Sequence, residues 1–203
     1  MGTVTGIEES RGQVTVWVDG APAVRVRKAH FDLCPVHEGD AIDVDAFVSR
    51  LASVQFADAY EAALTSLDRS ARSEKEIADS LRRRGYVAPA VEAVVARLKE
   101  NRLIDDARYA ERMAELQSRR PMGVYAFRRK LRAKGISEDD AEDALAAFDD
   151  DQQRAACLEA ARSLWRRYES LPPREARGKL SQALARRGFG WDAIEGAIDS
   201  IMG

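Results

Sequence analysis

Three side chains that could bind a metal ion, His30, Cys34 and His37, lie within eight residues of one another near the N-terminus. A structural zinc site takes four ligands, and no fourth ligand follows at a suitable spacing. We therefore expect a loop cysteine and two solvated histidines here, and no metal. The sequence also has no serine or cysteine nucleophile pattern, phosphate-binding glycine loop or His-Glu-x-x-His motif. It predicts a protein that is not an enzyme and that needs no cofactor.

Basic residues are the better candidates for a binding site. They form three runs, and the candidate residues are Arg82, Arg83, Arg128, Arg129, Lys130, Arg132, Lys134, Arg186 and Arg187. A single basic run is more often a solvated helix face, which the helix dipole favours near a helix C-terminus. The three runs recur at equivalent places in three repeats of the sequence, which are described below. This recurrence makes a binding role about as well supported as a solvated helix face.

The net charge of −2 hides a separation of charge along the chain. Every charged residue between 119 and 135 is basic, and every charged residue between 136 and 151 is acidic. In a helix-turn-helix protein, the helix after the turn enters the major groove of duplex DNA. Here that helix is acidic, with Asp192, Glu195 and Asp199 in the last repeat. Phosphates would repel it, so this mode of reading duplex DNA is excluded.

Three stretches of the chain align without a gap on Gly85, Gly135 and Gly188. Leucine stands four residues before each glycine, and apolar residues recur at matching positions on both sides. The spacing predicts one amphipathic helix before the glycine and another after it, with the glycine at positive φ between them. A further helix is expected before each pair, around residues 60–67, 108–117 and 155–168. The predicted units are three tandem three-helix repeats, at 53–105, 106–151 and 152–203, stacked as an elongated solenoid.

Residues 1–52 differ from the rest and predict a small β-rich domain. Residues 14–18 are rich in strand formers, residues 24–27 alternate apolar and charged side chains, and Asp19-Gly20 between them is a strong hairpin signal. Further strands are expected around 4–8 and 41–44. The predicted fold class is mostly α, with the repeats preceded by this N-terminal β segment.

Bulk properties narrow the expected setting. The two cysteines, Cys34 and Cys157, imply no disulfide framework and fit a reducing compartment. The sequence shows no basic and apolar leader and no run of eighteen apolar residues. We expect a cytoplasmic monomer without a membrane partner.

Several motifs resemble those of the RecX family. They are Leu103-Ile104-Asp105-Asp106-Ala107-Arg108-Tyr109-Ala110, Arg120-Pro121-Met122-Gly123 and Leu131-Arg132-Ala133-Lys134-Gly135-Ile136. The triple Leu-x-x-x-Gly arrangement and the N-terminal Val16-Trp17-Val18-Asp19-Gly20 are also similar to that family, so the resemblance covers nearly the whole chain. One departure is Leu171-Pro172-Pro173, which lengthens or breaks the link into the second helix of the third repeat.

The resemblance implies a regulator that binds RecA–single-stranded-DNA filaments and mainly inhibits RecA recombinase and coprotease activity. It implies a place in the filament groove, in contact with several RecA protomers, and leaves direct contact with single-stranded DNA open. The alternative is a nucleic-acid-binding helical-repeat module that acts without RecA. A third hypothesis is a helical scaffold for some other partner.

Overall fold

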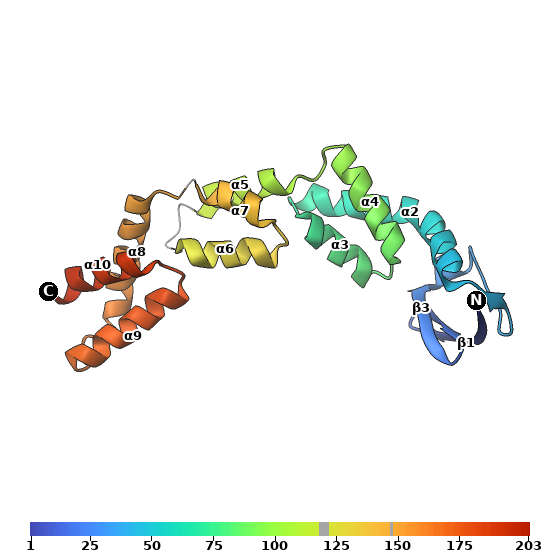
Figure 1. The fold of residues 1–203 in the computed structure, drawn as a ribbon, viewed down its shortest axis with the longest axis horizontal. Coiled ribbons are helices and arrows are strands. Elements are labelled where there is room, and N and C mark those ends of the chain that lie inside the picture. Colours follow the sequence, from blue (N-terminus) through green and yellow to red (C-terminus); the bar gives the residue numbers. More distant parts are fainter. Residues whose placement is uncertain (118–121, 147) are drawn as a thin grey trace. The chain divides into compact units, whose positions relative to one another are not determined.

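The computed structural model describes residues 1–117, 122–146 and 148–203, in two compact units, Met1–Asp105 and Asp106–Gly203 (Figure 1). Within these residues the chain is mostly helical, with ten helices and four strands, and all the strands lie before residue 43. Arg119, Arg120 and Pro121, which contribute to the basic run and to one family motif, lie outside the described residues.

The first unit begins with an antiparallel sheet of β1 (Gly2–Ser10), β2 (Gln13–Val18), β3 (Ala21–Arg27) and β4 (Ala41–Ile42), in the order β3-β2-β1-β4. The predicted hairpin is confirmed. Asp19 and Gly20 both have positive φ, 50° and 81°, as a two-residue type I′ turn requires. A short helix that the sequence did not predict, α1 (Lys28–Phe31), follows β3.

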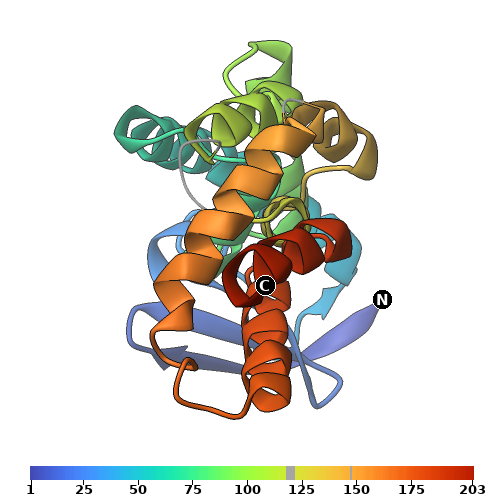
Figure 2. The same cartoon turned by 90° about the vertical axis from the view of Figure 1, so that its left-hand side faces the viewer.

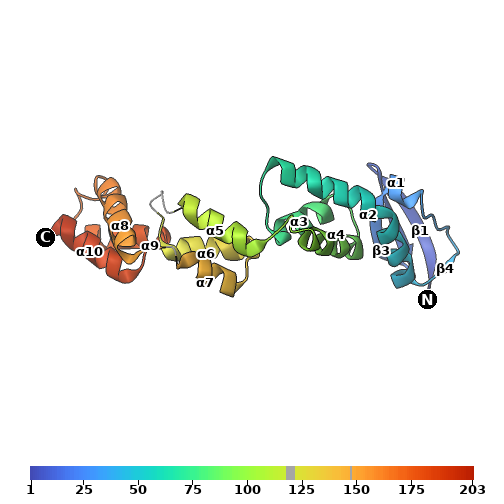
Figure 3. The same ribbon diagram turned by 90° about the horizontal axis from the view of Figure 1, so that it is seen from above.

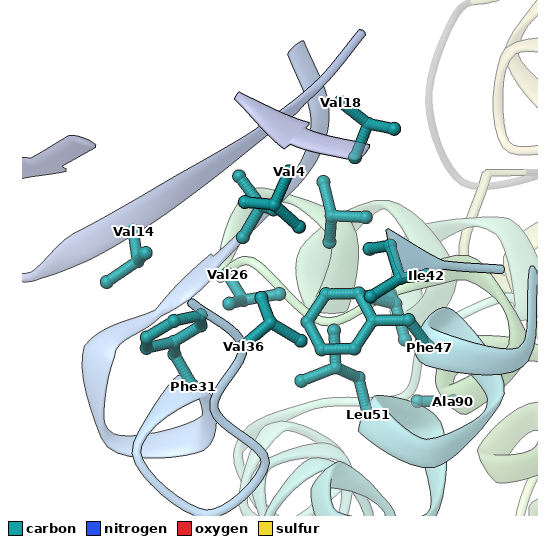
Figure 4. Packing of buried hydrophobic residues seen from close by; sticks show 13 residues of the cluster. Val4, Val14, Val18, Val26, Phe31, Val36, Ile42, Phe47, Leu51 and Ala90 are labelled. Carbon is teal, nitrogen blue, oxygen red and sulfur yellow. The ribbon is translucent and has the colours of Figure 1, made fainter. Parts of the chain in front are cut away.

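One long helix, α2 (Val44–Arg69), serves both the sheet and the first repeat. Its first turns lie against the sheet (Figure 3), where Phe47 and Leu51 pack among the inward-facing valines (Figure 4). Its later turns carry Ala59 and Ala63 into the core of the first repeat. The boundary expected between residues 52 and 53 therefore falls inside a continuous helix, and the four-part division of the chain stays a proposal.

The three predicted three-helix repeats are confirmed. The first combines α2 with α3 (Glu74–Arg83) and α4 (Ala88–Glu100). The second has α5 (Asp106–Gln117), α6 (Val124–Ala133) and α7 (Glu138–Leu145). The third has α8 (Asp150–Trp165), α9 (Pro173–Arg186) and α10 (Trp191–Met202), seen together in Figure 2. Stacking of all three into an elongated solenoid stays a prediction.

Each repeat has its own apolar core, built from the aligned positions. Leu81, Leu131 and Leu184, four residues before the glycines, are fully buried. The glycines themselves have φ of 83° to 86°, the left-handed conformation that ends a helix. Ser73 forms the expected capping box with Glu76 at the start of α3.

The two prolines that depart from the family pattern set the start of α9. Pro173 opens the helix, where its missing N–H has no intrahelical acceptor to lose, and Pro172 stands before it with an extended ψ of 140°. This helix has 14 residues, against 10 in each of α3 and α6. The repeat frame is therefore kept, with a longer second helix.

Candidate functional site

Two of the candidate basic residues, Arg128 and Arg129, lie in the middle of α6, and the others lie in or just after the last turn of α3, α6 or α9. Cations are favoured there because the last carbonyl groups of a helix are unpaired and carry partial negative charge. Most of these side chains are exposed; Arg128 and Lys134 are half-buried. The structure divides them into paired and unpaired groups.

In the second repeat, two of the candidate arginines are neutralised by the acidic run. Arg128 forms ion pairs with Glu138 at 3.3 Å and with Glu142 at 2.7 Å. Arg132 pairs with Glu138 at 3.1 Å. The charges that are separated along the chain are thus brought together across the turn between α6 and α7. Because their charge is already compensated, Arg128 and Arg132 are weaker candidates for an external anion.

In the first repeat, Arg82 pairs with Asp79 at 3.4 Å, and Lys75 pairs with the same carboxylate at 3.0 Å. The hydrogen bond from Lys75, with smaller contributions from Arg82 and Arg83, holds the pKa of Asp79 below its ordinary value. Arg83 is exposed and has no carboxylate within ion-pair distance among the described residues. It is the stronger candidate on α3.

The start of α6 meets the end of α9, which brings two basic runs together. The N–H of Gly123 donates to the carbonyl of Arg187 at 3.1 Å, and the N–H of Tyr125 donates to the carbonyl of Gly188 at 3.0 Å. The guanidinium of Arg129 donates to the carbonyl of Arg186 at 3.4 Å. These bonds satisfy carbonyl groups that the end of α9 leaves free.

Two glycines allow this close approach. A Cβ on Gly123 would overlap the backbone of Gly188 and Phe189, and a Cβ on Gly188 would overlap Ala126. Gly123 is the glycine of the family-like motif Arg120-Pro121-Met122-Gly123, and the close contact leaves no room for a larger residue at this position. We call this contact the repeat 2–3 junction.

The two helices that meet at the junction carry four exposed basic residues: Arg129 and Lys130 on α6, and Arg186 and Arg187 at the end of α9. We call them the junction cluster. All four are exposed, and none has a carboxylate within ion-pair distance among the residues that the structure describes. The junction cluster, like Arg83, thus keeps its charge available for an external anion.

The histidine prediction is wrong for one of the two residues. His30 is buried, with 6% of its surface exposed, and its Nε2 lies 3.0 Å from the carboxylate of Asp58. The amide of the fully buried Gln55 lies 3.5 Å from its Nδ1. Helix α2 supplies Asp58 and Gln55, a tertiary partnership that local sequence does not reveal. His37 is exposed as expected, and no group of three potential metal ligands is found in the described ranges.

This polar cluster ties the sheet to the first repeat. The side chain of Gln55 accepts from the N–H of Val87 at 2.8 Å, and Arg27 donates to the carbonyl of Arg84 at 3.0 Å. The hydroxyl of Tyr86 donates to Asp58 at 2.6 Å. This bond holds the pKa of Asp58 below its ordinary value, while burial and the same bond raise the pKa of Tyr86 to about 12. We therefore assign this cluster a role in holding the sheet against the first repeat and not in binding a ligand.

Among the described helices, none combines the length and apolar character needed to span a membrane. Fold and surface together define a tandem three-helix-repeat protein with basic helix ends. Three family models match in chain order: the first three-helix domain of RecX at residues 59–98, the second at 105–145 and the third at 150–198. The chain belongs to the RecX family.

Relatives and solved structures agree with this assignment. The chain is 28% identical to "Regulatory protein RecX" of Limosilactobacillus reuteri (strain DSM 20016), over 96% of this chain and 74% of the relative. It is 32% identical to the protein of the same name from Prosthecochloris aestuarii, over 64% of this chain and 84% of the relative. A crystal structure of regulatory protein RecX superposes with a TM-score of 0.69 and 27% identity, covering 98% of this chain and all of the other. RecX from Lactobacillus salivarius gives a TM-score of 0.64 and 29% identity, covering 73% of this chain and 97% of the other.

Proposed function

We propose that this protein binds RecA–single-stranded-DNA filaments and modulates, mainly inhibits, RecA recombinase and coprotease activity, without catalysing a reaction itself. The family membership supports a regulatory role, because the relatives are named regulatory proteins. Since the proposed partner is a DNA-bound recombinase, we place this action in the cytoplasm.

The junction cluster is the observation that supports a particular binding surface for this partner. The single-stranded DNA of such a filament carries phosphates, which attract uncompensated cations. Four exposed cations without carboxylate partners would contribute mainly to the rate and register of association. We propose the junction cluster and Arg83 as the principal contacts, with Arg82, Arg128, Arg132 and Lys134 as secondary ones.

The test is a RecA DNA-dependent ATPase or strand-exchange assay with the double variant Lys130→Glu, Arg187→Glu. No side-chain bond of these two residues is found in the described part of the chain, so the fold should survive their reversal. We expect a sharp loss of inhibition. Removing two phosphate contacts should also reduce the slope of log affinity against log salt by about 1.4, since each contact on a single strand contributes about 0.7.

A matched control is the double variant Arg166→Glu, Arg167→Glu. It makes the same change in charge in the same compact unit, on exposed residues just beyond α8. These residues precede α9, so a 14-residue helix of about 21 Å separates them from the junction. If a folded Lys130→Glu, Arg187→Glu variant inhibits RecA as well as the control does, the junction cluster is not the binding surface.

The uncompensated charge of the junction cluster also favours a second candidate, a nucleic-acid-binding module that needs no RecA. Comparing binding to bare and to RecA-coated single-stranded DNA at one salt concentration separates the two. Preference for coated DNA supports the filament regulator, whereas equal binding supports the module.

A further inference from the structure

Two exposed aromatic side chains adjoin the repeat 2–3 junction. Tyr125, on α6, is 57% exposed, and Trp191, the first residue of α10, is 62% exposed. The backbone of Tyr125 is fixed by its bond to Gly188, and its ring lies 3.7 Å from the place that a Cβ on Gly190 would take. The two aromatic residues therefore flank Gly190, beside the end of α9 that carries Arg186 and Arg187.

Trp191 also forms one wall of a groove between α9 and α10. The groove has a volume of about 230 Å³ and is lined by Arg174, Arg177, Ser181 and Glu195, with Ile194 and Ile198 among its apolar lining. Arg177 is paired with Asp199 at 2.8 Å. Arg174 has no carboxylate within ion-pair distance in the described ranges, so one further cation is available there.

Exposed aromatic rings beside unpaired cations are the elements of single-stranded nucleic-acid binding. Each base offers a flat face that stacks on an aromatic side chain, and nearby cations follow the phosphates. A duplex keeps its bases paired and stacked inside, so it would not present their faces in this way. The surface thus fits a single strand whose bases are turned toward the protein.

We propose that Trp191 and Tyr125 form a platform on which bases of single-stranded nucleic acid stack, with the phosphates on the junction cluster. This extends the DNA contact of the proposed function, on which it rests, but it does not require RecA. Stacking is tolerant of base identity, so the platform binds strands of any sequence.

The first experiment measures affinity for a fluorescein-labelled oligo-dT by anisotropy, in the absence of RecA. Trp191→Leu, which keeps an apolar side chain but removes the ring, should weaken binding about 5- to 150-fold, the range that corresponds to one stacked base. Trp191→Phe should restore most of the affinity. Leu116→Ala, on α5, removes another side chain that is 64% exposed and should change nothing.

A second measurement tests for the base itself. An abasic oligonucleotide of equal length keeps every phosphate, so Trp191→Leu should have little effect on its binding. In a Trp17→Phe, Trp165→Phe background, Trp191 is the remaining tryptophan, and oligo-dT should quench its fluorescence more than the abasic strand does.

Three results would overturn the platform: no binding of oligo-dT by the parent, parental affinity in a folded Trp191→Leu variant, or equal losses for oligo-dT and the abasic strand. The RecA assay distinguishes these from failure of the proposed function. If inhibition depends on Lys130 and Arg187 while Trp191→Leu binds oligo-dT normally, the stacking proposal fails and the filament regulator stands. If oligo-dT binding depends on Trp191 while RecA is unaffected by the protein, the platform stands and the filament regulator fails.

Discussion

The repeats require glycine for two reasons, a positive φ at a helix end and a close contact between two helices, and three glycine substitutions separate them. Gly85 has a φ of 86°, but an added Cβ would meet its nearest atoms at 3.7 Å or more, which is ordinary contact. Gly123 has an ordinary φ of −73°, yet a Cβ there would overlap the backbone of Gly188. Gly188 combines a φ of 83° with overlap against Ala126. Gly85→Ala thus tests backbone strain alone, Gly123→Ala tests the junction alone, and Gly188→Ala tests both.

The expected losses follow from these geometries. Gly85→Ala should cost about 1–2 kcal/mol, the penalty of a left-handed conformation for a residue with a Cβ. Gly123→Ala forces the helix ends apart and breaks the hydrogen bonds to Arg187, Gly188 and Arg186, for a total of roughly 1.5–4.5 kcal/mol at a net 0.5–1.5 kcal/mol each. Gly188→Ala should cost most, roughly 2.5–6.5 kcal/mol, because it adds the backbone penalty to the loss of the junction.

Urea denaturation provides the measurement, with Trp17 reporting on the first unit and Trp165 and Trp191 on the second. Gly85→Ala should shift the transition of the first unit, and the other two variants should shift that of the second. If Gly123→Ala is as stable as the parent, or Gly188→Ala costs no more than Gly85→Ala, the close contact between α6 and α9 does not exist in solution.

Three further predictions concern the cores. Leu131→Ala should destabilise the second unit by about 2–5 kcal/mol because this side chain is fully buried; a parental melting temperature would contradict its place in the repeat core. Tyr86→Phe should lower the melting temperature at pH 7. The pKa of Asp58 is lowered and that of Tyr86 is raised to about 12, so the difference in stability between parent and variant should be full between about pH 5 and pH 9. It should fade as Asp58 is protonated below about pH 4 and as pH rises through 12, where Tyr86 ionises. A difference in stability that is constant with pH would argue against the hydrogen bond between Tyr86 and Asp58. Cys157, whose pKa burial raises to about 11, should react with a thiol reagent at pH 8 only after denaturant is added, whereas half-buried Cys34 should react in the folded protein; fast modification of both would show that the third core is open.

The repeat frame could be predicted because its signals are local. Glycine at a helix end and leucine one turn before it act within a few residues, so Leu81 and Gly85 indicate the turn on their own. Asp43 illustrates a local signal that was present but missed. Its carboxylate accepts from the N–H groups of Asp45 and Ala46, so α2 begins there and runs on through the helix expected around residues 60–67.

Only part of the candidate site could be predicted from the sequence. That basic residues would lie on exposed helix ends follows from helical periodicity, but the pairing of Arg128 with Glu142 depends on how α6 and α7 cross. The same holds for Arg129, whose partner is 57 residues away. The exposure of Trp191 could not be predicted either, because Trp191 shares one face of α10 with Ile194 and Ile198, a spacing that predicts a buried ring.

The shared helix α2 has a consequence for how the first unit folds. Its first turns complete the core of the sheet and its later turns complete the core of the first repeat, so neither core can form until the helix has formed. A helix nucleates locally and quickly, whereas pairing β1 with β4 closes a loop of some forty residues. We therefore expect α2 to be structured early in the folding transition state, with both cores condensing on it. Amides near Leu51 and Gln55 should then exchange with solvent only when all of residues 1–105 unfold together.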